Sequence, residues 1–491
     1  MMSSQREPKG DRRQELQAVE DAARALAGAA FAALREENLI PPSRYHPYLE
    51  VGRDYEGGVL RGLAEFEHLE QELNSTFDER FGDPLKRLDY DFANLWIFSF
   101  VEACIARCSR NDEPFEVTSS GVDQSITELV TALASPEGEV ACCRVVSHLT
   151  TVDGSPVEVG GVLIVPDSAN DLFQEIGKHI PGGTTAFNRD PPWPMELPLA
   201  LIVVRDHGFD RHNVGDLLSR RISRFLRLVR LAFASTAQSL YEIRGETTLV
   251  RRYKPELVVF SGSKTLVQRT VRLSSNDDSA VFGIGQLVDT MARRPKGMLM
   301  TSFGLALSKF DTSFQSGGWD EQIIDLMTAL EGALSGTSKT DVVLRLETRA
   351  AALLAEPNDS AGDIFNDLKN LYDLRSKLVH GGTLKESELT KKNYGISTVP
   401  KDAPAGTATA YMVDRLRDLA RRSILARVAL GTPPDPLWPI AGDEGVDATL
   451  SDDAAREQWR SAWREGLSAV GAGAAANRAR PANEFFSPEE R

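Results

Sequence analysis

The sequence lacks any long apolar run. No stretch of this 491-residue chain approaches the roughly eighteen uninterrupted apolar residues of a membrane-spanning helix. Residues 1–17 are polar and contain no apolar segment of the kind that a secretory signal needs. We therefore expect a cytoplasmic protein that has no membrane partner.

Cysteine is scarce as well. The chain has four cysteines: Cys104 and Cys108 are four residues apart on an expected helix, and Cys142 and Cys143 are adjacent on an expected strand. These spacings match neither a disulfide framework nor a zinc site, so buried free thiols are predicted. Residues 206–212 are rich in Asp, Gly and His, a composition that predicts a turn in preference to a metal site. We expect no metal and no cofactor.

Basic residues are fewer than acidic ones. With 56 Lys and Arg against 71 Asp and Glu, the net charge is −15, which argues against a surface devoted to nucleic acid. Local basic clusters remain, and one is an expected helix over 214–238 that carries Arg220, Arg224 and Arg227 away from its apolar stripe. Two interpretations stay open: a solvated face paired with acidic neighbours, or a docking face for RNA or protein.

Periodicity predicts an α+β fold, with a mixed α/β N-terminal region before an all-α bundle. Helices are expected at 11–37, 59–75, 87–108, 169–179 and 214–238. β-like runs are expected at 139–151, 157–165, 197–204 and 256–260. From about 298 the pattern is helical. The predicted segments are an N-terminal helical segment 1–112, a mixed domain 113–297, a helical domain 298–430, and an extension 431–491. This extension is expected to contain a short helix around 451–469 and a disordered tail over 471–491.

Histidine is rare, and its last occurrence stands apart. Six of the seven histidines precede residue 213, whereas His380 follows Arg375 by five residues. Two glycines, Gly381 and Gly382, must end there a helix expected from about Asp363. Five residues correspond to about 140° around a helix. The arginine and the imidazole therefore do not stack on one face, and the helix end must be shaped for them to converge.

Arg375 occupies a place in the predicted apolar stripe of this helix, which also contains Ile364, Leu368, Leu371 and Leu378. A guanidinium on a core-facing stripe requires a carboxylate, a set of carbonyls or a phosphate ligand.

Two other charged side chains, Glu331 and Arg349, occupy similar positions on the two preceding expected helices. They are natural partners for Arg375 or for each other. The alternative is a buried ion-pair network that is purely structural.

Three segments together resemble the Apea-like branch of the HEPN superfamily. They are ALSKFDTSFQSGGWDEQIIDLMTALEGALSG, LRLETRAAALLA and IFNDLKNLYDLRSKLVHGG, within residues 298–430. Arg375 and His380 fall on the R-x4-6-H motif of the superfamily, while Leu330-Glu331 and Thr348-Arg349 fall on its LE and R positions. The resemblance implies an all-α HEPN-type bundle that forms a homodimer with two motifs facing one another.

In catalytic members this motif cleaves RNA without a metal and leaves a 2′,3′-cyclic phosphate. The resemblance thus implies an endoribonuclease effector of a bacterial defence or toxin type. His380 is the candidate general acid or base, Arg375 the phosphate ligand and Ser376 a positioning group, with Tyr372 and Asp373 as further supporting residues. The alternative is a non-catalytic HEPN module that binds a nucleotide, RNA or a partner protein.

Basic residues near the motif are candidate RNA contacts. Lys377 lies on the motif helix, and Lys391 and Lys392 lie in a long connection over 383–409, interpreted either as an RNA-contacting lid or as disorder. The expected helix 410–430 is also basic. Its arginines, counted in support of RNA contact, are Arg415, Arg417, Arg421, Arg422 and Arg427.

Overall fold

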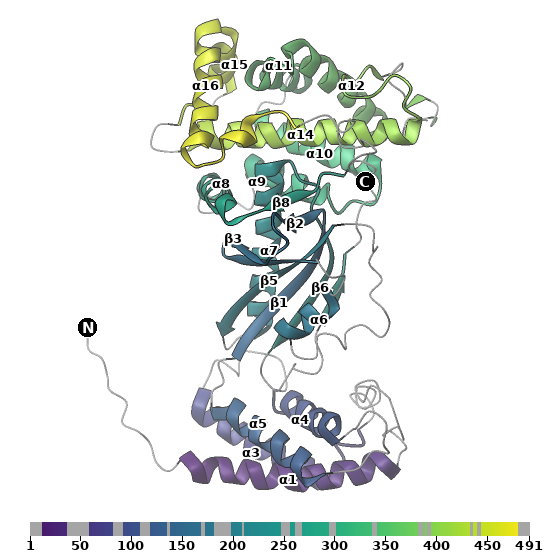
Figure 1. Cartoon of the computed structure of the whole chain (residues 1–491), viewed down its shortest axis with the longest axis vertical. Helices are drawn as coiled ribbons and strands as arrows, with labels where there is room; N and C mark the ends of the chain where they lie inside the picture. Colours follow the sequence, from purple (N-terminus) through teal and green to yellow (C-terminus); the bar gives the residue numbers. More distant parts are fainter. Residues whose placement is uncertain are drawn as a thin grey trace, which may run out of the picture.

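A computed structural model describes most of the chain. The described residues are 12–36, 58–81, 92–108, 118–134, 138–167, 172–180, 198–208, 211–246, 256–260, 268–293, 301–335, 341–381, 385, 388–389, 394–432, 436–438 and 443–479. The fold is α+β, as predicted, with an antiparallel sheet between two helical parts (Figure 1).

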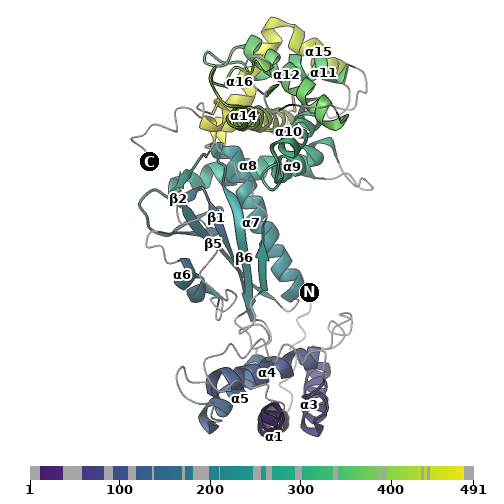
Figure 2. The ribbon, with the colours of Figure 1, turned by 90° about the vertical axis from the view of Figure 1, so that its right-hand side faces the viewer.

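Within the described residues before 135, four helices form the N-terminal helical unit at one end of the molecule (Figures 1 and 2). They are α1 (Arg12–Glu36), α3 (Ala64–Phe81), α4 (Phe92–Cys108) and α5 (Ser119–Ala134). In α1 the apolar residues Val19, Leu26 and Leu34 recur at helical spacing, and all three are fully buried. Helix α4 buries Trp96 and Phe100 in the same core.

Helix α5 was not predicted from the sequence, and it belongs to this N-terminal helical unit. Val122, Ile126, Leu129 and Leu133 lie in one core with α1, α3 and α4. The unit therefore ends near Ala134 and not at residue 112, the boundary expected from the sequence. The physical reason is the apolar stripe of α5, which needs the face of α1 and α4 to exclude water.

The sheet has the strand order β3-β4-β5-β1-β6-β7, and every pair in it is antiparallel. Its strands are β1 (Gly138–Ser147), β3 (Val157–Val159), β4 (Val162–Pro166), β5 (Leu199–Gly208), β6 (Gln238–Glu246) and β7 (Glu256–Val259). A separate parallel pair joins β2 (Leu149–Thr151) to β8 (Val271–Leu273).

Both faces of the sheet are covered because adjacent residues of a strand point to opposite faces. Helix α7 (Arg211–Phe233) covers the face that contains Cys142, and α6 (Leu172–His179) covers the face that contains Cys143. All four cysteines are free and buried, as predicted. The thiols are thus packing residues of the core.

A buried ion pair attaches α7 to the sheet. Arg144 on β1 lies beside Glu242 on β6, and its Nε donates to the Glu242 carboxylate at 2.7 Å. The same guanidinium donates to Ser219 Oγ on α7 at 2.8 Å and to Ser223 Oγ at 2.9 Å. Burial would raise the pKa of Glu242, but the charge and hydrogen bonds of Arg144 outweigh burial and lower it.

Two expected elements end differently in the structure. Helix α7 stops at Phe233, where Ala234 has a left-handed backbone with φ of 53°, and β6 starts within the range expected to be helical. The run 157–165 is a hairpin, β3 and β4, and its turn residues Gly160 and Gly161 have φ of 61° and 69°. Two left-handed residues are typical of the tightest hairpin turns, which explains the glycine pair.

The chain is helical from α9 onward, as predicted, and α8 just before it was not predicted. The helices of this C-terminal half are α8 (Asp278–Ala292), α9 (Ser302–Thr312), α10 (Trp319–Leu334), α11 (Val342–Leu354), α12 (Ala361–Val379), α14 (Ala405–Gly431), α15 (Asp443–Ser451) and α16 (Asp453–Ala469). Helix α14 runs through the middle of this half, between α10 on one side and α11, α12 and α16 on the other (Figures 1 and 2).

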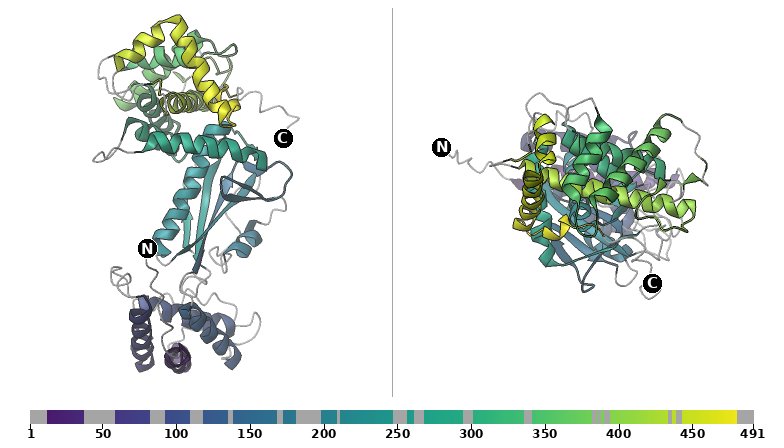
Figure 3. Two further views of the ribbon diagram at one scale, coloured as in Figure 1. Left: turned by 90° about the vertical axis from the view of Figure 1, so that its left-hand side faces the viewer. Right: turned by 90° about the horizontal axis from the view of Figure 1, so that it is seen from above.

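The mixed domain and the helical domain share one core. Apolar residues from the α7 face of the sheet continue without a break through α8 and α9 to α10 and α14. In Figure 3 the helical half rests directly on one end of the sheet and α7. The boundary expected at 297 therefore does not separate two cores.

The expected C-terminal extension also belongs to this core. Trp438, Trp463 and Leu467 are buried against the other helices, and residues 473–476 form the short helix η5 (Gly473–Ala476), which includes the buried Ala475. The expected disordered tail 471–491 is therefore ordered as far as residue 479, and residues 480–491 lie outside the described residues. None of the described helices has the length and apolar character needed to cross a membrane.

Replacement of Trp463 by Ala tests the contribution of α16 to the core. The indole is fully buried, and its Nε1 donates to the Leu353 carbonyl at 3.3 Å. Loss of a buried Trp is expected to lower the free energy of unfolding by about 3–5 kcal/mol. Phe282→Ala on α8 is the control, because Phe282 is 60% exposed and its loss is expected to cost at most about 0.5 kcal/mol. Denaturant unfolding measures both, and equal losses would contradict a core role for α16.

Candidate functional site at the end of α12

Helix α12 carries the Arg375 and His380 motif, and its two ends form as the sequence predicts. At the start, the Ser360 side chain accepts a hydrogen bond from the Asp363 backbone N–H at 3.1 Å. At the other end, Val379 is the last helical residue and His380 is the cap. Gly381 follows with φ of 70°, a conformation that glycine adopts at no steric cost.

Arg375 lies beside the apolar stripe and not within it, contrary to the prediction. Leu374 takes the place in the core and is fully buried, whereas Arg375 is half-buried. The guanidinium carbon lies 5.6 Å from the centre of the Tyr372 ring. Its Nε is buried and finds no hydrogen-bond partner among the described residues. This arginine therefore has one buried donor that forms no hydrogen bond with the described residues.

Glu331 on α10 completes this cluster. It accepts a hydrogen bond from the Tyr372 hydroxyl, and it experiences the positive charge of Arg375. Burial raises the pKa of Glu331, and the arginine and the tyrosine offset this only in part. Burial and the nearby Glu331 carboxylate raise the pKa of Tyr372. The expected pairing of Glu331 with Arg375 is thus present as a charge interaction between α10 and α12.

His380 is exposed at the end of α12. Its backbone N–H donates to the Ser376 carbonyl at 3.0 Å, while Ser376 itself is half-buried. Within the described part of the chain, no hydrogen bond joins the imidazole to Arg375. A solvent-facing imidazole and a half-buried guanidinium therefore occupy neighbouring turns of one helix end.

Arg349 has partners other than those expected. It is 1% exposed, and its Nε donates to Asp447 on α15 at 2.7 Å. Its Nη1 donates to the Leu334 carbonyl at the end of α10 at 2.6 Å. Arg349 thus belongs to a buried structural ion pair at the end of α10, as in the second of the two interpretations of this residue.

The other candidate residues near the motif lie on its exposed side. Asp373 is exposed, and Lys377 Nζ lies 3.5 Å from the Tyr394 hydroxyl and 5.3 Å from the centre of its ring. Lys391 and Lys392 lie outside the described residues. The later part of the connection 383–409 packs inward, because Tyr394 is buried and Ser397 N donates to Asp367 on α12 at 2.7 Å.

The basic residues of α7 are mostly paired. Arg224 binds Asp289 on α8 at 2.6 Å, and Arg227 Nε binds Asp311 on α9 at 2.6 Å. Arg220 is exposed. For Arg224 and Arg227 the interpretation as a solvated face paired with acidic neighbours is the one the structure supports.

The arginines of α14 do not face a ligand in solvent, which corrects the expectation that they add to an RNA surface. All five are buried. Arg415 Nη2 donates to Asp359 at 2.7 Å, and Arg422 Nε donates to Asp418 at 3.0 Å. Arg422 also contacts Asp359, which is 0% exposed. Three arginines of α14, Arg415, Arg421 and Arg422, are paired with aspartates of α14, α12 and the loop before α12.

The described residues contain no group of three or more His, Cys, Asp or Glu side chains arranged to hold a metal ion. Comparisons with protein-family models, curated proteins and solved structures find no match to this chain.

Arg422→Met tests the α14 network. The substitution leaves Asp359 and Asp418 buried with fewer partners, so a loss of about 3–5 kcal/mol in the free energy of unfolding is expected. The matched control is Arg224→Met, whose pair with Asp289 is 44% and 54% exposed and is expected to contribute at most about 1 kcal/mol. Comparable losses of unfolding free energy in the two variants would show that the buried ion pairs stabilise the fold no more than the exposed pair does.

Acid titration tests the same network. Burial raises the pKa of Asp418, but Arg422 and Arg421 outweigh burial and hold it well below its usual range. Because the unfolded pKa is about 3.9, this stabilisation is complete above about pH 5 and is lost as pH falls toward the folded pKa. We expect the melting temperature to drop steeply below about pH 4. Asp418→Asn is expected to melt lower at pH 7 and to show a shallower acid slope, and parallel profiles would contradict this assignment.

Proposed function

We propose that the helical half of this protein cleaves RNA at the end of α12, without a metal. The observation that supports the proposal is that an exposed His380 and a half-buried Arg375 lie on neighbouring turns of one helix end. The resemblance of residues 298–430 to the Apea-like branch of the HEPN superfamily supports the same activity. RNA would be the substrate, and the setting would be that of a defence or toxin effector.

A histidine, an arginine and a serine are sufficient for RNA cleavage without a metal. The 2′-hydroxyl oxygen attacks the adjacent phosphorus, the bond from phosphorus to the 5′-oxygen breaks, and the products are a 2′,3′-cyclic phosphate and a 5′-hydroxyl. An imidazole ring can accept or donate a proton, so His380 can take the proton of the 2′-hydroxyl or give one to the leaving oxygen. The half-buried guanidinium of Arg375 stabilises the negative charge on the phosphate, and Ser376 helps to position it.

A homodimer through the helical domain is part of the proposal. Helices α11 and α12 pack against each other as a hairpin, so the start of α11 lies near the end of α12. Two exposed apolar side chains mark this region, Leu344 on α11 at 55% and Val379 beside His380 at 46%. A second copy covering them would bring two motifs together and would exclude water from the phosphate site.

Glu331 favours a second candidate, a non-catalytic module that binds RNA, a nucleotide or a partner protein. Its carboxylate already interacts with Arg375, and it competes with a phosphate for the same guanidinium. In this alternative Arg375 holds α12 to α10, and His380 contacts a ligand without transferring a proton.

Cleavage of total RNA in EDTA separates the two candidates. The wild type is expected to produce fragments with 2′,3′-cyclic phosphate and 5′-hydroxyl ends. His380→Ala is expected to reduce the rate by about 10²–10⁴-fold, because general acid–base catalysis is lost. Arg375→Ala is expected to reduce it by about 10²–10³-fold. End-group analysis of the fragments provides the measurement.

Asn366→Ala is the matched control, since Asn366 is exposed on the same helix but remote from its end. It should retain the wild-type rate, and circular dichroism should confirm that all variants are folded. Cleavage that persists unchanged in His380→Ala would overturn the ribonuclease proposal. Absence of cleavage together with RNA binding that depends on Arg375 would favour the non-catalytic module.

A further inference from the structure

Residues 473–479 follow α16 and lie between the sheet and the helical bundle. They consist of η5 and the three residues after it, and the yellow end of the chain lies beside α14 in Figure 1. We call residues 473–479 the strap. Its helical part, η5, contacts α7 of the mixed domain as well as α14 and α16. The strap therefore joins elements from both parts of the shared core.

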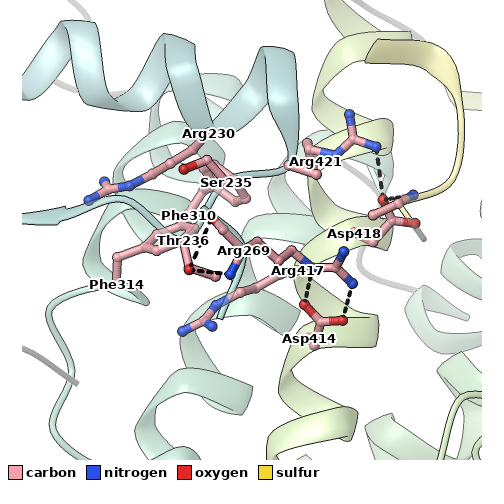
Figure 4. A pocket seen from close by; sticks show the side chains of 12 residues that line it. Arg230, Ser235, Thr236, Arg269, Phe310, Phe314, Asp414, Arg417, Asp418 and Arg421 are labelled. Carbon is pink, nitrogen blue, oxygen red and sulfur yellow. Dashed lines mark hydrogen bonds and ion pairs between the residues drawn. The ribbon is translucent and has the colours of Figure 1, made fainter. Parts of the chain in front are cut away.

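Charged side chains of α14 bind the backbone of the strap. Arg421 donates to the Ala475 carbonyl at 2.6 Å and to the Asn477 carbonyl at 2.7 Å. The Ala479 backbone N–H donates to the Asp418 carboxylate at 3.1 Å. Figure 4 shows Arg421 directed at Asp418, close to the yellow ribbon of the strap. Hydrogen bonds to charged groups are stronger than those between neutral groups, so these three contacts attach the strap to α14.

Arg478, the charged residue of the strap, binds the loop before α12. Its backbone N–H donates to Glu356 Oε1 at 2.8 Å, and its Nη1 donates to the Asn358 carbonyl at 2.8 Å. The same Nη1 lies 3.3 Å from Oδ1 of Asp359, which is fully buried. Because α12 begins at Ala361, the strap fixes the loop from which that helix starts.

The strap buries little apolar surface. Five of its seven residues are glycine or alanine, and its two most buried side chains, Ala475 and Ala476, are methyl groups that are each 2% exposed. A methyl group gains less from burial than the large side chains of the core do. The strap is thus attached mainly by hydrogen bonds. An element with few apolar contacts opens at a lower free energy than the core around it.

Release of the strap leaves no buried charge without a partner. Arg421 keeps the carboxylate of Asp418 at 2.8 Å. Asp359 keeps Arg415 and Arg422. An isolated buried charge is the change that costs a buried network most, and release of the strap does not create one. The remaining bundle therefore has the partners that it needs to stay folded.

We propose that the strap is a separable element, which leaves its place between α7, α14 and the loop 355–360 while the helical bundle stays folded. The groove that it fills recognises a peptide with two adjacent small residues and an arginine two positions after them. Binding of the strap fixes the loop and the first turn of α12, and its release makes them mobile. This conformational device does not depend on RNA cleavage at the other end of α12.

A matched pair of substitutions in the full chain tests this proposal. Ala476→Trp places a large side chain where a methyl group is buried, so it is expected to displace the strap, whereas Ala474→Trp is the control because Ala474 is exposed. In Ala476→Trp we expect amide exchange in residues 355–364 to be about 10-fold faster and the melting temperature to be roughly 2–4 °C lower. Exchange in α1, which belongs to a separate core, is expected to stay the same in both variants.

Arg478→Gln tests the attachment to the loop without adding bulk. It is expected to speed exchange in residues 355–364 by about 10-fold, because a charge-assisted contact is lost. Arg220→Gln, on the exposed side of α7, is its control. Unchanged exchange in Arg478→Gln would overturn the proposal. Unfolding of the whole helical half in Ala476→Trp would also overturn it, because the strap would then be an inseparable part of the core.

A synthetic peptide of residues 473–479 tests recognition by the groove. Added in excess to the Ala476→Trp variant, it is expected to restore the slow exchange of residues 355–364, because a ligand that binds only the ordered state stabilises that state. The same peptide with Arg478→Gln is expected to have no effect. Failure of the unmodified peptide, or equal restoration by both peptides, would contradict the proposed recognition.

Discussion

The neutralisation of buried guanidinium groups around α14 is the constraint on which the C-terminal half depends. Asp359, with no exposure at all, lies between Arg415 and Arg422, and Arg478 approaches it at 3.3 Å. Each of these charges is costly to bury alone, so the helices that carry them must pack in an arrangement that pairs the charges. The network therefore selects the packing, while the surrounding apolar residues supply most of the favourable free energy.

This network also places the candidate site. Arg415 Nε donates at 2.8 Å to Asp367, in the middle of α12, and Asp367 also accepts from Ser397 N. From Asp367 to Arg375 the helix rises about 12 Å. One part of α12 is thus held by buried charge, and its far end extends toward solvent with His380 exposed. Rigidity behind an exposed reactive group is what a phosphate-handling site requires.

Some features of α12 and α14 could be predicted from the sequence, and others could not. The helix and its glycine-terminated end followed from local rules, because capping and periodicity act within a few residues, whereas the exposure of His380 was not predicted. The predicted apolar stripe was wrong by one residue at Arg375. Whether Leu374 or Arg375 faces the core depends on how α12 is rotated against α10. The burial of Arg415 and Arg422 could not be predicted either, because their partner Asp359 lies far away in the sequence. From their spacing in the sequence alone, these arginines were predicted to add to a basic surface.

Other errors have the same origin. Helix α5 and strand β6 were missed because the faces that cover them belong to distant elements. Asp418, three residues before Arg421 and four before Arg422, was a sequence signal of pairing within α14.

Hydrogen exchange of the full chain with and without single-stranded RNA tests the central claim most directly. If the end of α12 is an RNA site supported by a buried network, RNA will slow amide exchange in residues 372–381, and the already protected amides of α14 will not change. Protection confined to α7, or no protection anywhere, would contradict this account.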